Sequence, residues 1–304
     1  MMPLLIVLTG PTGIGKTETA LTLAARFGCD IVSADSRQIY REMRIGTAAP
    51  TKEEMKNIRH HFVHTVSIHD RYNAGKFELE VLSLLEHLFM TNPVVVMAGG
   101  SMLYIDAVCR GIDDLPEVDP EIRAGLIQRW EAEGIECLRF ELKKLDPDYY
   151  SQVDLHNPKR LLHALEMCIM SGIPYSRMRT NTIKVRPFRI LKIGLTAERG
   201  IIYDRINRRV DRMIADGLEQ EAAVLYPFRA YQALNTVGYR EWFDFLDGKS
   251  NREETIEKIK SNSRRYARKQ LTWFRKDPDI RWFDIRDKNL VIPYVEEFIS
   301  GLKE

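Results

Sequence analysis

The chain alternates short apolar runs with longer segments in which apolar residues recur every three to four positions. Apolar runs of strand length occupy residues 4–8, 29–33, 93–98 and 189–195. Helical patterns follow them at residues 18–27, 77–88, 102–109 and 197–217. Fully buried strands that alternate with helices predict an α/β fold with a parallel sheet, whose ligands bind at the carboxyl ends of the strands.

A different pattern separates the third apolar run from the fourth. An acidic, proline-containing joint at residues 113–119 leads into three helical patterns with few strand signals, at residues 120–134, 136–145 and 158–171. We therefore expect a discontinuous α/β core, residues 1–112 and 187–304, with an inserted all-helical domain over residues 113–186. The spacing also predicts a polar helix over residues 51–59 of the core.

The turn after the first apolar run has the P-loop pattern G-x-x-x-x-G-K-[ST] between a strand and a helix. Its glycines allow backbone N–H groups to point at an anion, and the helix N-terminus adds positive potential. We expect these residues to bind a diphosphate or polyphosphate, with the Thr17 hydroxyl available to Mg²⁺: Gly10, Pro11, Thr12, Gly13, Ile14, Gly15, Lys16 and Thr17. The fold expected from this motif is a P-loop NTPase-like sheet flanked by helices.

Two further strand ends should lie beside this loop. Asp35 follows the second apolar run, and its carboxylate could accept a proton, hold a metal-bound water or cap a following helix. The third run ends in Gly99-Gly100-Ser101, where a motor or switch ATPase would carry an acidic residue. This absence argues against nucleotide hydrolysis.

Basic residues cluster in two helical segments. Arg205, Arg208, Arg209 and Arg212 lie on the helix after the fourth run; we expect one of them to reach the phosphate site, because the alternative for the set is a solvated basic face. Near the C-terminus, one helical stripe carries cations and no acid and could follow a phosphate backbone; it comprises Arg265, Arg268, Lys269, Thr272 and Lys276.

Charge, cysteine spacing and hydropathy argue against several kinds of site and classes of protein. The formal charge is only +2, so any nucleic-acid role depends on local clusters rather than on net charge. The four cysteines are far apart, which disfavours a zinc site or a disulfide scaffold. His60, His61 and His64 lack a nearby acidic partner in the sequence, so we expect packing roles rather than a metal site. No segment has the pattern of a signal peptide or a membrane span, and a cytoplasmic protein with no membrane partner is expected.

Taken together, ten stretches resemble the tRNA dimethylallyltransferase family, also called tRNA isopentenyltransferases. They run in order along nearly the whole chain, at residues 10–17, 33–40, 45–48, 60–61, 98–104, 119–120, 157–161, 164–166, 237–240 and 268–275. Only the first of these, the P-loop, is common in other proteins.

The resemblance implies transfer of a dimethylallyl group from dimethylallyl diphosphate to N6 of the adenosine 3′-adjacent to a tRNA anticodon. The P-loop would then hold the leaving pyrophosphate rather than ATP, with Mg²⁺ as cofactor. The implied catalytic residues are Asp35 as base, Lys16, Thr17 and Arg209 at the phosphates, and Ser101 near the adenine or Asp35.

The same resemblance implies an extended tRNA-binding surface. Its residues are Asp35, Ser36, Arg37, Gln38, Ser101, Arg123, Lys159, Arg160, Leu161, Leu162, His163, Asn235, Thr236, Val237, Gly238, Tyr239, Arg240, Arg265, Arg268 and Lys269. Many relatives carry Lys at Ala49, Thr at Ser101 and Arg at His163. Ser101 retains the hydroxyl, whereas Ala49 and His163 each remove a possible cation, which bears on affinity rather than on reaction type.

Three alternatives remain open from the sequence. An adenylate isopentenyltransferase would share the loop and the carboxylate, but it needs neither the helical insertion nor the basic C-terminal helix. A P-loop small-molecule kinase would transfer phosphate from ATP. A non-catalytic P-loop RNA-binding protein would bind tRNA without forming product.

Overall fold

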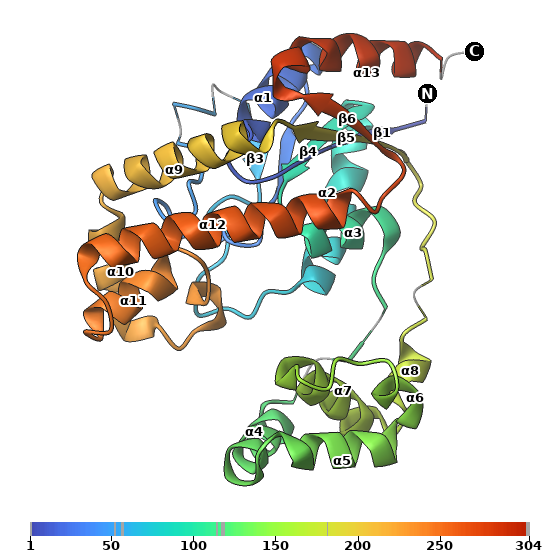
Figure 1. Cartoon of the computed structure of the whole chain (residues 1–304). Helices are drawn as coiled ribbons and strands as arrows, with labels where there is room; N and C mark the ends of the chain where they lie inside the picture. Colours follow the sequence, from blue (N-terminus) through green and yellow to red (C-terminus); the bar gives the residue numbers. More distant parts are fainter. Residues whose placement is uncertain are drawn as a thin grey trace. The chain divides into compact units, whose positions relative to one another are not determined.

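The computed structural model describes residues 2–51, 53–55, 58–113, 115–116, 119–180 and 182–301. Within them, six strands form one all-parallel sheet in the order β3-β2-β4-β1-β5-β6 (Figure 1). The strands are β1 (Leu4–Thr9), β2 (Ile31–Ala34), β3 (His60–His61), β4 (Val94–Gly99), β5 (Arg189–Thr196) and β6 (Ile280–Asp284). The predicted α/β class is confirmed.

Alternating residues of the central strand explain why helices cover both faces of the sheet. Leu4, Ile6 and Leu8 of β1 pack with residues of α1 (Lys16–Phe27) and α13 (Val291–Ser300). Leu5 and Val7 pack on the opposite face with residues of α2 (Ala74–Thr91) and α3 (Met102–Arg110). Both clusters are buried, which is the arrangement expected of a parallel sheet.

The strand register places three strand ends side by side. Leu8 of β1 pairs with Ala98 of β4, and Ala34 of β2 pairs with Gly99 at the end of β4. The segments that follow these strands therefore begin next to one another at the carboxyl edge of the sheet.

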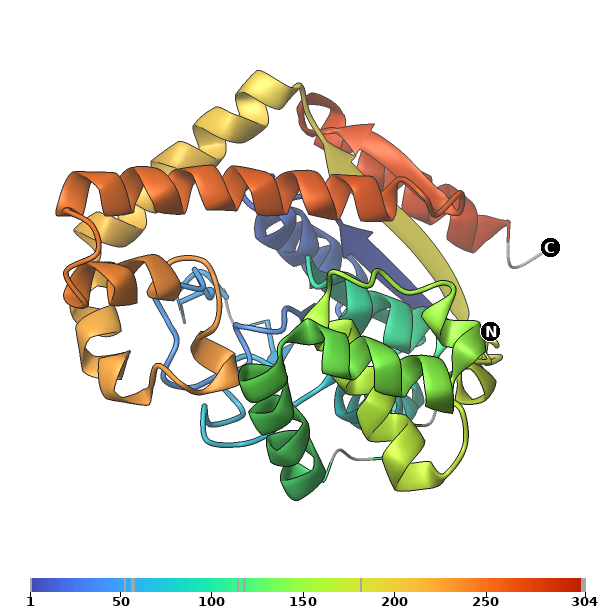
Figure 2. The same ribbon diagram turned by 60° about the horizontal axis from the view of Figure 1, so that its bottom comes forward.

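The remaining helices of the core extend beyond this edge. The long helices α9 (Arg199–Ala215) and α12 (Arg252–Phe274) pack against each other (Figures 1 and 2). A third apolar cluster joins them to α10 (Leu218–Leu225) and α11 (Tyr239–Leu246), with the fully buried side chain of Trp242 among its members. The described part of the core also contains three 3₁₀ helices, η1 (Tyr226–Phe228), η2 (Gln232–Leu234) and η3 (Ile285–Leu290).

The chain divides into two compact units, Met1–Cys109 with Val185–Glu304, and Arg110–Lys184. The second unit is helical and has its own apolar cluster, which includes Leu138, Leu142 and Leu165. Its helices are α4 (Pro120–Glu133), α5 (Ile135–Leu145), α6 (Pro147–Tyr150), α7 (Pro158–Ser171) and α8 (Tyr175–Met178). Asp119 caps α4 and Asn157 caps α7, each with proline at the first turn, which explains why both helices begin where the sequence predicts.

The helix predicted over residues 51–59 is wrong at the positions that the structure describes. In the expected helix over residues 51–59, the described positions are turn or irregular, and positions 52, 56 and 57 lie outside the described residues. Thr51 accepts a hydrogen bond from the Glu54 N–H through its hydroxyl and from the Met55 N–H through its carbonyl, which closes a capped turn at the start of this segment. Of the helices in the described part of the chain, none combines the length and hydropathy of a membrane span.

Candidate active site

The phosphate loop joins β1 to α1, and Lys16 lies folded against it. The Lys16 Nζ donates hydrogen bonds to the carbonyls of Gly10 (2.9 Å) and Pro11 (3.0 Å). Burial, with an additional effect of Arg209, lowers the pKa of Lys16 to about 7, and Asp35 partly opposes the shift. Gly15, at the N-cap of α1, has the left-handed conformation (φ 105°) and offers no side-chain cap. The loop is thus built to present backbone N–H groups and a lysine to an anion.

A buried glutamine of α12 fastens this loop to the end of β4. Gln270 accepts a hydrogen bond from the Thr12 N–H (2.8 Å) through Oε1 and donates one to the Gly100 carbonyl (2.8 Å) through Nε2. Because its side chain is only 2% exposed, both bonds form in a largely water-free environment. Gln270 therefore sets the spacing between two strand ends that line the site.

Asp35 stabilises a turn rather than a helix. Its Oδ1 accepts hydrogen bonds from the N–H groups of Arg37 (2.9 Å) and Gln38 (3.3 Å), and residues 36–39 form a turn. This local cap is compatible with a chemical role, because a carboxylate has acceptor capacity beyond two hydrogen bonds.

Ser101, two residues after the end of β4, stabilises the same turn. Its Oγ accepts a hydrogen bond from the Ser36 N–H (2.7 Å) and donates one to the Ser36 Oγ (3.1 Å). A side chain cannot replace the glycine two positions earlier, since a Cβ at Gly99 would lie 2.1 Å from the Ala34 carbonyl oxygen. The acidic residue absent from the end of β4 is thus excluded by the close approach of β2.

Helix α9 contributes more cations than expected. Arg205, Arg208, Arg209 and Arg212 all line one cavity with the phosphate loop, so the expectation that only one of them reaches the site is wrong. Each of these four positions lies three or four residues from two of the others, so they share one face of α9, and this face lies along the cavity. Arg205 Nε donates to the Gly13 carbonyl (2.7 Å) and so reaches the loop directly.

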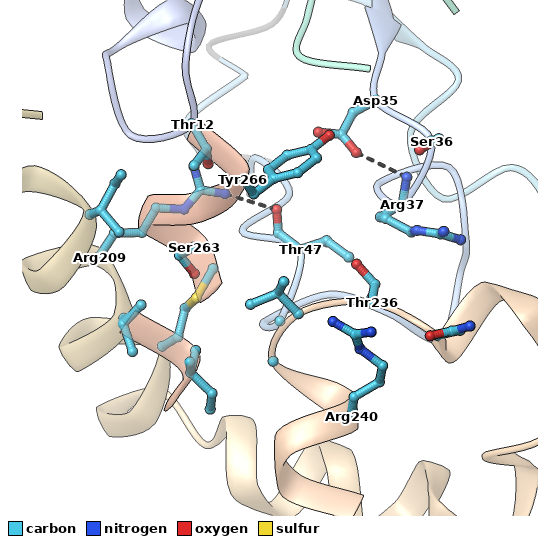
Figure 3. Close-up of a pocket in the computed structure, with 18 residues that line it drawn as sticks. Thr12, Asp35, Ser36, Arg37, Thr47, Arg209, Thr236, Arg240, Ser263 and Tyr266 are labelled. Atoms are coloured by element: carbon cyan, nitrogen blue, oxygen red, sulfur yellow. Dashed lines mark hydrogen bonds between the residues drawn. The ribbon is translucent and has the colours of Figure 1, made fainter. Parts of the chain in front are cut away.

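Arg209 is the most enclosed of these arginines. It donates a hydrogen bond to the Thr47 carbonyl (3.0 Å; Figure 3). Burial lowers the pKa of Arg209, and the neighbouring Asp35 carboxylate opposes that shift. A guanidinium retains its charge in such surroundings, so Arg209 adds a fixed cation between the loop and Asp35.

Two cavities meet at these residues. The larger, of about 1270 Å³, contains the phosphate loop and the α9 arginines. The smaller, of about 370 Å³, is lined by residues 235–238 and Arg240 together with Ser36 and Arg37 (Figure 3). Among the residues that the structure describes, five line both cavities, namely Thr12, Asp35, Arg209, Met213 and Tyr266. An anion in the larger cavity and a second substrate in the smaller one would therefore meet beside the Asp35 carboxylate.

Not every predicted binding residue lines these cavities. Tyr239 is fully buried, and its hydroxyl donates to Glu221. The side chains of Leu161 and Leu162 are buried in the apolar cluster of the helical unit.

The polar residues predicted in the helical unit have a different environment. Lys159 and Arg160 are exposed on α7. The Arg123 guanidinium lies 3.2 Å from the Glu166 carboxylate, and the His163 ring lies 3.7 Å from the same carboxylate. Arg123 and His163 are thus held by a carboxylate that is itself fully buried.

The predicted basic stripe lies on α12. Arg265, Arg268 and Lys269 are exposed, whereas Ala267 and Gln270 on the other side of the helix are buried. The three cations do not line either cavity. They form a surface beside the site rather than part of its interior.

The histidine cluster has structural partners. His61 Nε2 lies 2.8 Å from Asp30 Oδ2, and His60 Nδ1 lies 2.9 Å from the Ile58 carbonyl oxygen. The predicted hydrogen-bonding role is confirmed for His60 and His61. The acidic partner of His61 is absent from the neighbouring sequence, because the pairing of β2 with β3 brings Asp30 beside it. No group of three or more histidine, cysteine, aspartate or glutamate side chains suited to a metal occurs in the described part of the chain.

Sequence reasoning did not identify Tyr266, Gln270 or Met213 as site residues. Tyr266 and Gln270 lie within the basic C-terminal segment, but the predicted binding stripe comprises exposed residues on another face of the same helix. The signal that could have found them is the pair of uncharged polar or aromatic residues among the cations of this helix. Their position in the site depends on a contact between α12 and the phosphate loop, which no local pattern encodes.

Comparison with known proteins agrees with this geometry. The IPP transferase family model matches residues 38–277. The chain is 53% identical to tRNA dimethylallyltransferase 1 of Bacteroides fragilis, over 97% of this chain and 98% of that one, and 54% identical to tRNA dimethylallyltransferase 1 of Phocaeicola vulgatus, over 96% and 97%.

Solved structures give the same result. The full-length tRNA isopentenylpyrophosphate transferase of Bacillus halodurans has a TM-score of 0.70 and 34% identity, with 99% of each chain covered. A eukaryotic dimethylallyltransferase described as acting on tRNA shares the fold, with a TM-score of 0.81 at 24% identity, over 98% of this chain and 80% of that one. By its sequence, its fold and the family model that spans most of it, this chain belongs to the IPP transferase family.

Proposed function

We propose that this protein transfers a dimethylallyl group from dimethylallyl diphosphate to N6 of the adenosine 3′-adjacent to the anticodon of a tRNA, with release of pyrophosphate. The observation that carries the proposal is the pair of cavities that meet at Asp35 and Arg209. One cavity is built for a diphosphate, and the other is a separate space for an acceptor. The relatives named tRNA dimethylallyltransferase support the choice of tRNA.

In this proposal the larger cavity holds the diphosphate of the donor. The loop N–H groups, Lys16 and Arg209 surround it, and their attraction grows as negative charge develops on the leaving group. The C1–O bond breaks with its electron pair passing to pyrophosphate. Arg205 and Arg208, which also line this cavity, would bind the same anion before and after bond cleavage.

The smaller cavity would receive the adenine. An adenine in an anticodon loop can leave its stack at a cost of about a few kcal/mol. Its N6 lone pair forms the new bond to C1, and the N6 proton passes to the Asp35 carboxylate. Asp35 suits this role because it faces both cavities while its backbone hydrogen bonds fix its position.

The residues at the loop also fit a Mg²⁺ ion. Thr17 lines the larger cavity and has an exposed side chain. Magnesium usually takes one or two protein oxygens together with substrate phosphates and water, so a hydroxyl beside a diphosphate is a suitable partner. When bound, the ion would supply additional positive charge to the leaving group.

A continuous assay for pyrophosphate tests this function. The purified protein with Mg²⁺ and dimethylallyl diphosphate should release pyrophosphate only when unmodified tRNA is added. Release that depends on AMP instead of tRNA would identify an adenylate isopentenyltransferase. Conversion of ATP to ADP without a prenyl donor would identify a kinase, and tRNA binding without any turnover would identify an RNA-binding protein.

A further inference from the structure

Tyr266 lies in the site but has no role in the proposed reaction steps. It lies on α12 and is one of the five residues that line both cavities. Among the described residues that line either cavity, it is the only phenylalanine, tyrosine or tryptophan. Figure 3 shows its ring beside the Asp35 carboxylate. The ring therefore lies where the donor and the acceptor would meet.

The positive charges of the diphosphate site disfavour the positive charge that develops on the dimethylallyl group. As the C1–O bond lengthens, positive charge develops on the allylic carbons while negative charge develops on the pyrophosphate. Lys16 and Arg209 stabilise the pyrophosphate, but they repel a cation in the same region. Among the five shared residues, Asp35 is the only one with a negative charge.

An aromatic face resolves this conflict without weakening the diphosphate site. The face of a tyrosine ring carries a partial negative charge from its quadrupole, and it attracts a cation within about 6 Å of the ring centre. Unlike a second carboxylate, a neutral ring does not repel pyrophosphate. Tyr266 is 36% exposed; burial of the remainder and the Asp35 charge raise its pKa to about 12, so the phenol stays neutral near pH 7.

We propose that Tyr266 is a further catalytic residue, whose ring faces the dimethylallyl group and stabilises the positive charge that develops on it. This inference rests on the proposed function. The C1–O bond breaks and its electron pair leaves with pyrophosphate, the N6 lone pair forms the C1–N6 bond, and the N6 proton passes to Asp35. Tyr266 neither gains nor loses a proton or an electron in the step.

Single-turnover rates distinguish the ring from the hydroxyl. Tyr266→Leu removes the ring at similar bulk and should slow the chemical step about 30-fold, the rate equivalent of a cation–π contact from which the bound substrates exclude water. Tyr266→Phe keeps the ring and should retain the rate within about threefold. Equal losses in the two variants would assign the effect to the hydroxyl and overturn the proposal.

A binding measurement tests the same claim without turnover. The probes are 3-methylbut-2-enyl ammonium, which carries a positive charge near the position of C1, and the neutral 3-methylbut-2-en-1-ol, each with pyrophosphate. The wild-type protein should prefer the ammonium ion, and Tyr266→Leu should reduce this preference about tenfold, whereas Tyr266→Phe should keep it. Tyr203→Leu makes the same exchange at a half-buried tyrosine of α9 that lines neither cavity, and this matched control should leave the ratio unchanged.

The outcomes separate the inference from the proposed function. If wild-type protein forms no prenylated adenosine, the proposed function fails. If it does, but Tyr266→Leu keeps both the single-turnover rate and the ammonium preference, only the inference fails. A Tyr266→Leu variant with an unchanged rate and a raised KM for tRNA alone would show that the ring stacks on adenine instead. Thermal melting and pyrophosphate binding verify that each variant is folded.

Discussion

At the scale of single residues, Asp35 has two tasks that can be separated by substitution. Its Oδ1 accepts hydrogen bonds from two backbone N–H groups, and its carboxylate is the proposed acceptor of the N6 proton. Asp35→Asn keeps an oxygen acceptor for the turn but removes the base. We expect turnover to fall by about 10² or more, the usual scale of acid–base catalysis, while tRNA binding changes little.

The measurement is kcat beside the tRNA dissociation constant for Asp35→Asn and Asp35→Ala. Alanine also removes the cap of the turn, so any additional loss of tRNA binding in that variant reports on structure rather than on chemistry. Wild-type turnover in the asparagine variant would show that Asp35 is not the base.

The pKa of Lys16 predicts proton uptake when the diphosphate binds. In the free protein this pKa is lowered to about 7, so at pH 8 most molecules lack the proton, whereas below pH 7 most already carry it. A bound anion favours the charged lysine and raises its pKa again. Pyrophosphate binding at pH 8 should therefore take up nearly one more proton in the wild type than in Lys16→Arg, which stays charged.

Titration calorimetry in buffers of different ionisation enthalpy measures this difference. Comparison with the arginine variant cancels the protonation of pyrophosphate itself. The difference should shrink as the pH falls below about 7, because the free lysine then already carries its proton. Equal uptake in the two proteins at pH 8 would refute the lowered pKa.

The residues that could be identified from the sequence are those whose neighbours in the chain explain them. Lys16 and Thr17 follow from the P-loop spacing, and Asp35 from its place after a strand. Tyr266 and Gln270 could not be assigned in this way, because Gln270 meets Thr12 across 258 positions of the chain. Contacts of this kind arise only when the helices have packed on the sheet.

At the scale of elements, one carboxylate holds a loop that lines the larger cavity. Glu221 of α10 accepts hydrogen bonds from the N–H groups of Arg44 (3.0 Å), Ile45 (2.9 Å) and Gly46 (2.9 Å) and from the Tyr239 hydroxyl (2.6 Å). Arg44 and Ile45 line this cavity. A turn without regular structure is thus fixed by a helix that lies 175 positions further along the chain.

Glu221→Ala should release this loop. We expect a loss of about 2–4 kcal/mol in the free energy of unfolding, since several partly buried hydrogen bonds lose their acceptor. Hydrogen exchange of the amides at positions 44–46 should accelerate. Glu219→Ala on the same helix removes an exposed partner of Arg252 and should cost less than about 0.5 kcal/mol. Unchanged exchange at these amides in Glu221→Ala would contradict this account of the loop.

Helices and strands with a strong period were predictable, and those defined by tertiary contacts were not. The inserted helices match their predicted limits closely because proline and a capping side chain mark where α4 and α7 begin. The two-residue strand β3 carries no pattern of its own, and its pairing with β2 defines it. The polar helix expected over residues 51–59 is not seen at the described positions, because Met55 and Ile58 alone are too few apolar residues to form a buried helix face.

At the scale of the whole molecule, charge is distributed locally rather than in excess. The net charge is +2, yet exposed cations gather on α12. Arg268→Ala with Lys269→Ala should weaken tRNA binding and reduce the slope of log K against log salt by about one unit for each lost phosphate contact.

A matched pair of charges elsewhere provides the control for this experiment. Arg281 and Arg286 are exposed cations near β6, and their replacement by alanine removes the same net charge. This control should leave the salt slope unchanged. Equal slopes in the α12 variant and the wild type would remove this helix face from the tRNA interface.

The most direct test of the account is mass spectrometry of nucleosides from unmodified tRNA after incubation with the protein, Mg²⁺ and dimethylallyl diphosphate, beside a parallel reaction with AMP. We expect N6-dimethylallyl adenosine from tRNA, located beside the anticodon after nuclease digestion, and no prenylated AMP. Prenylated AMP without modified tRNA, or no product from either acceptor, would contradict the account.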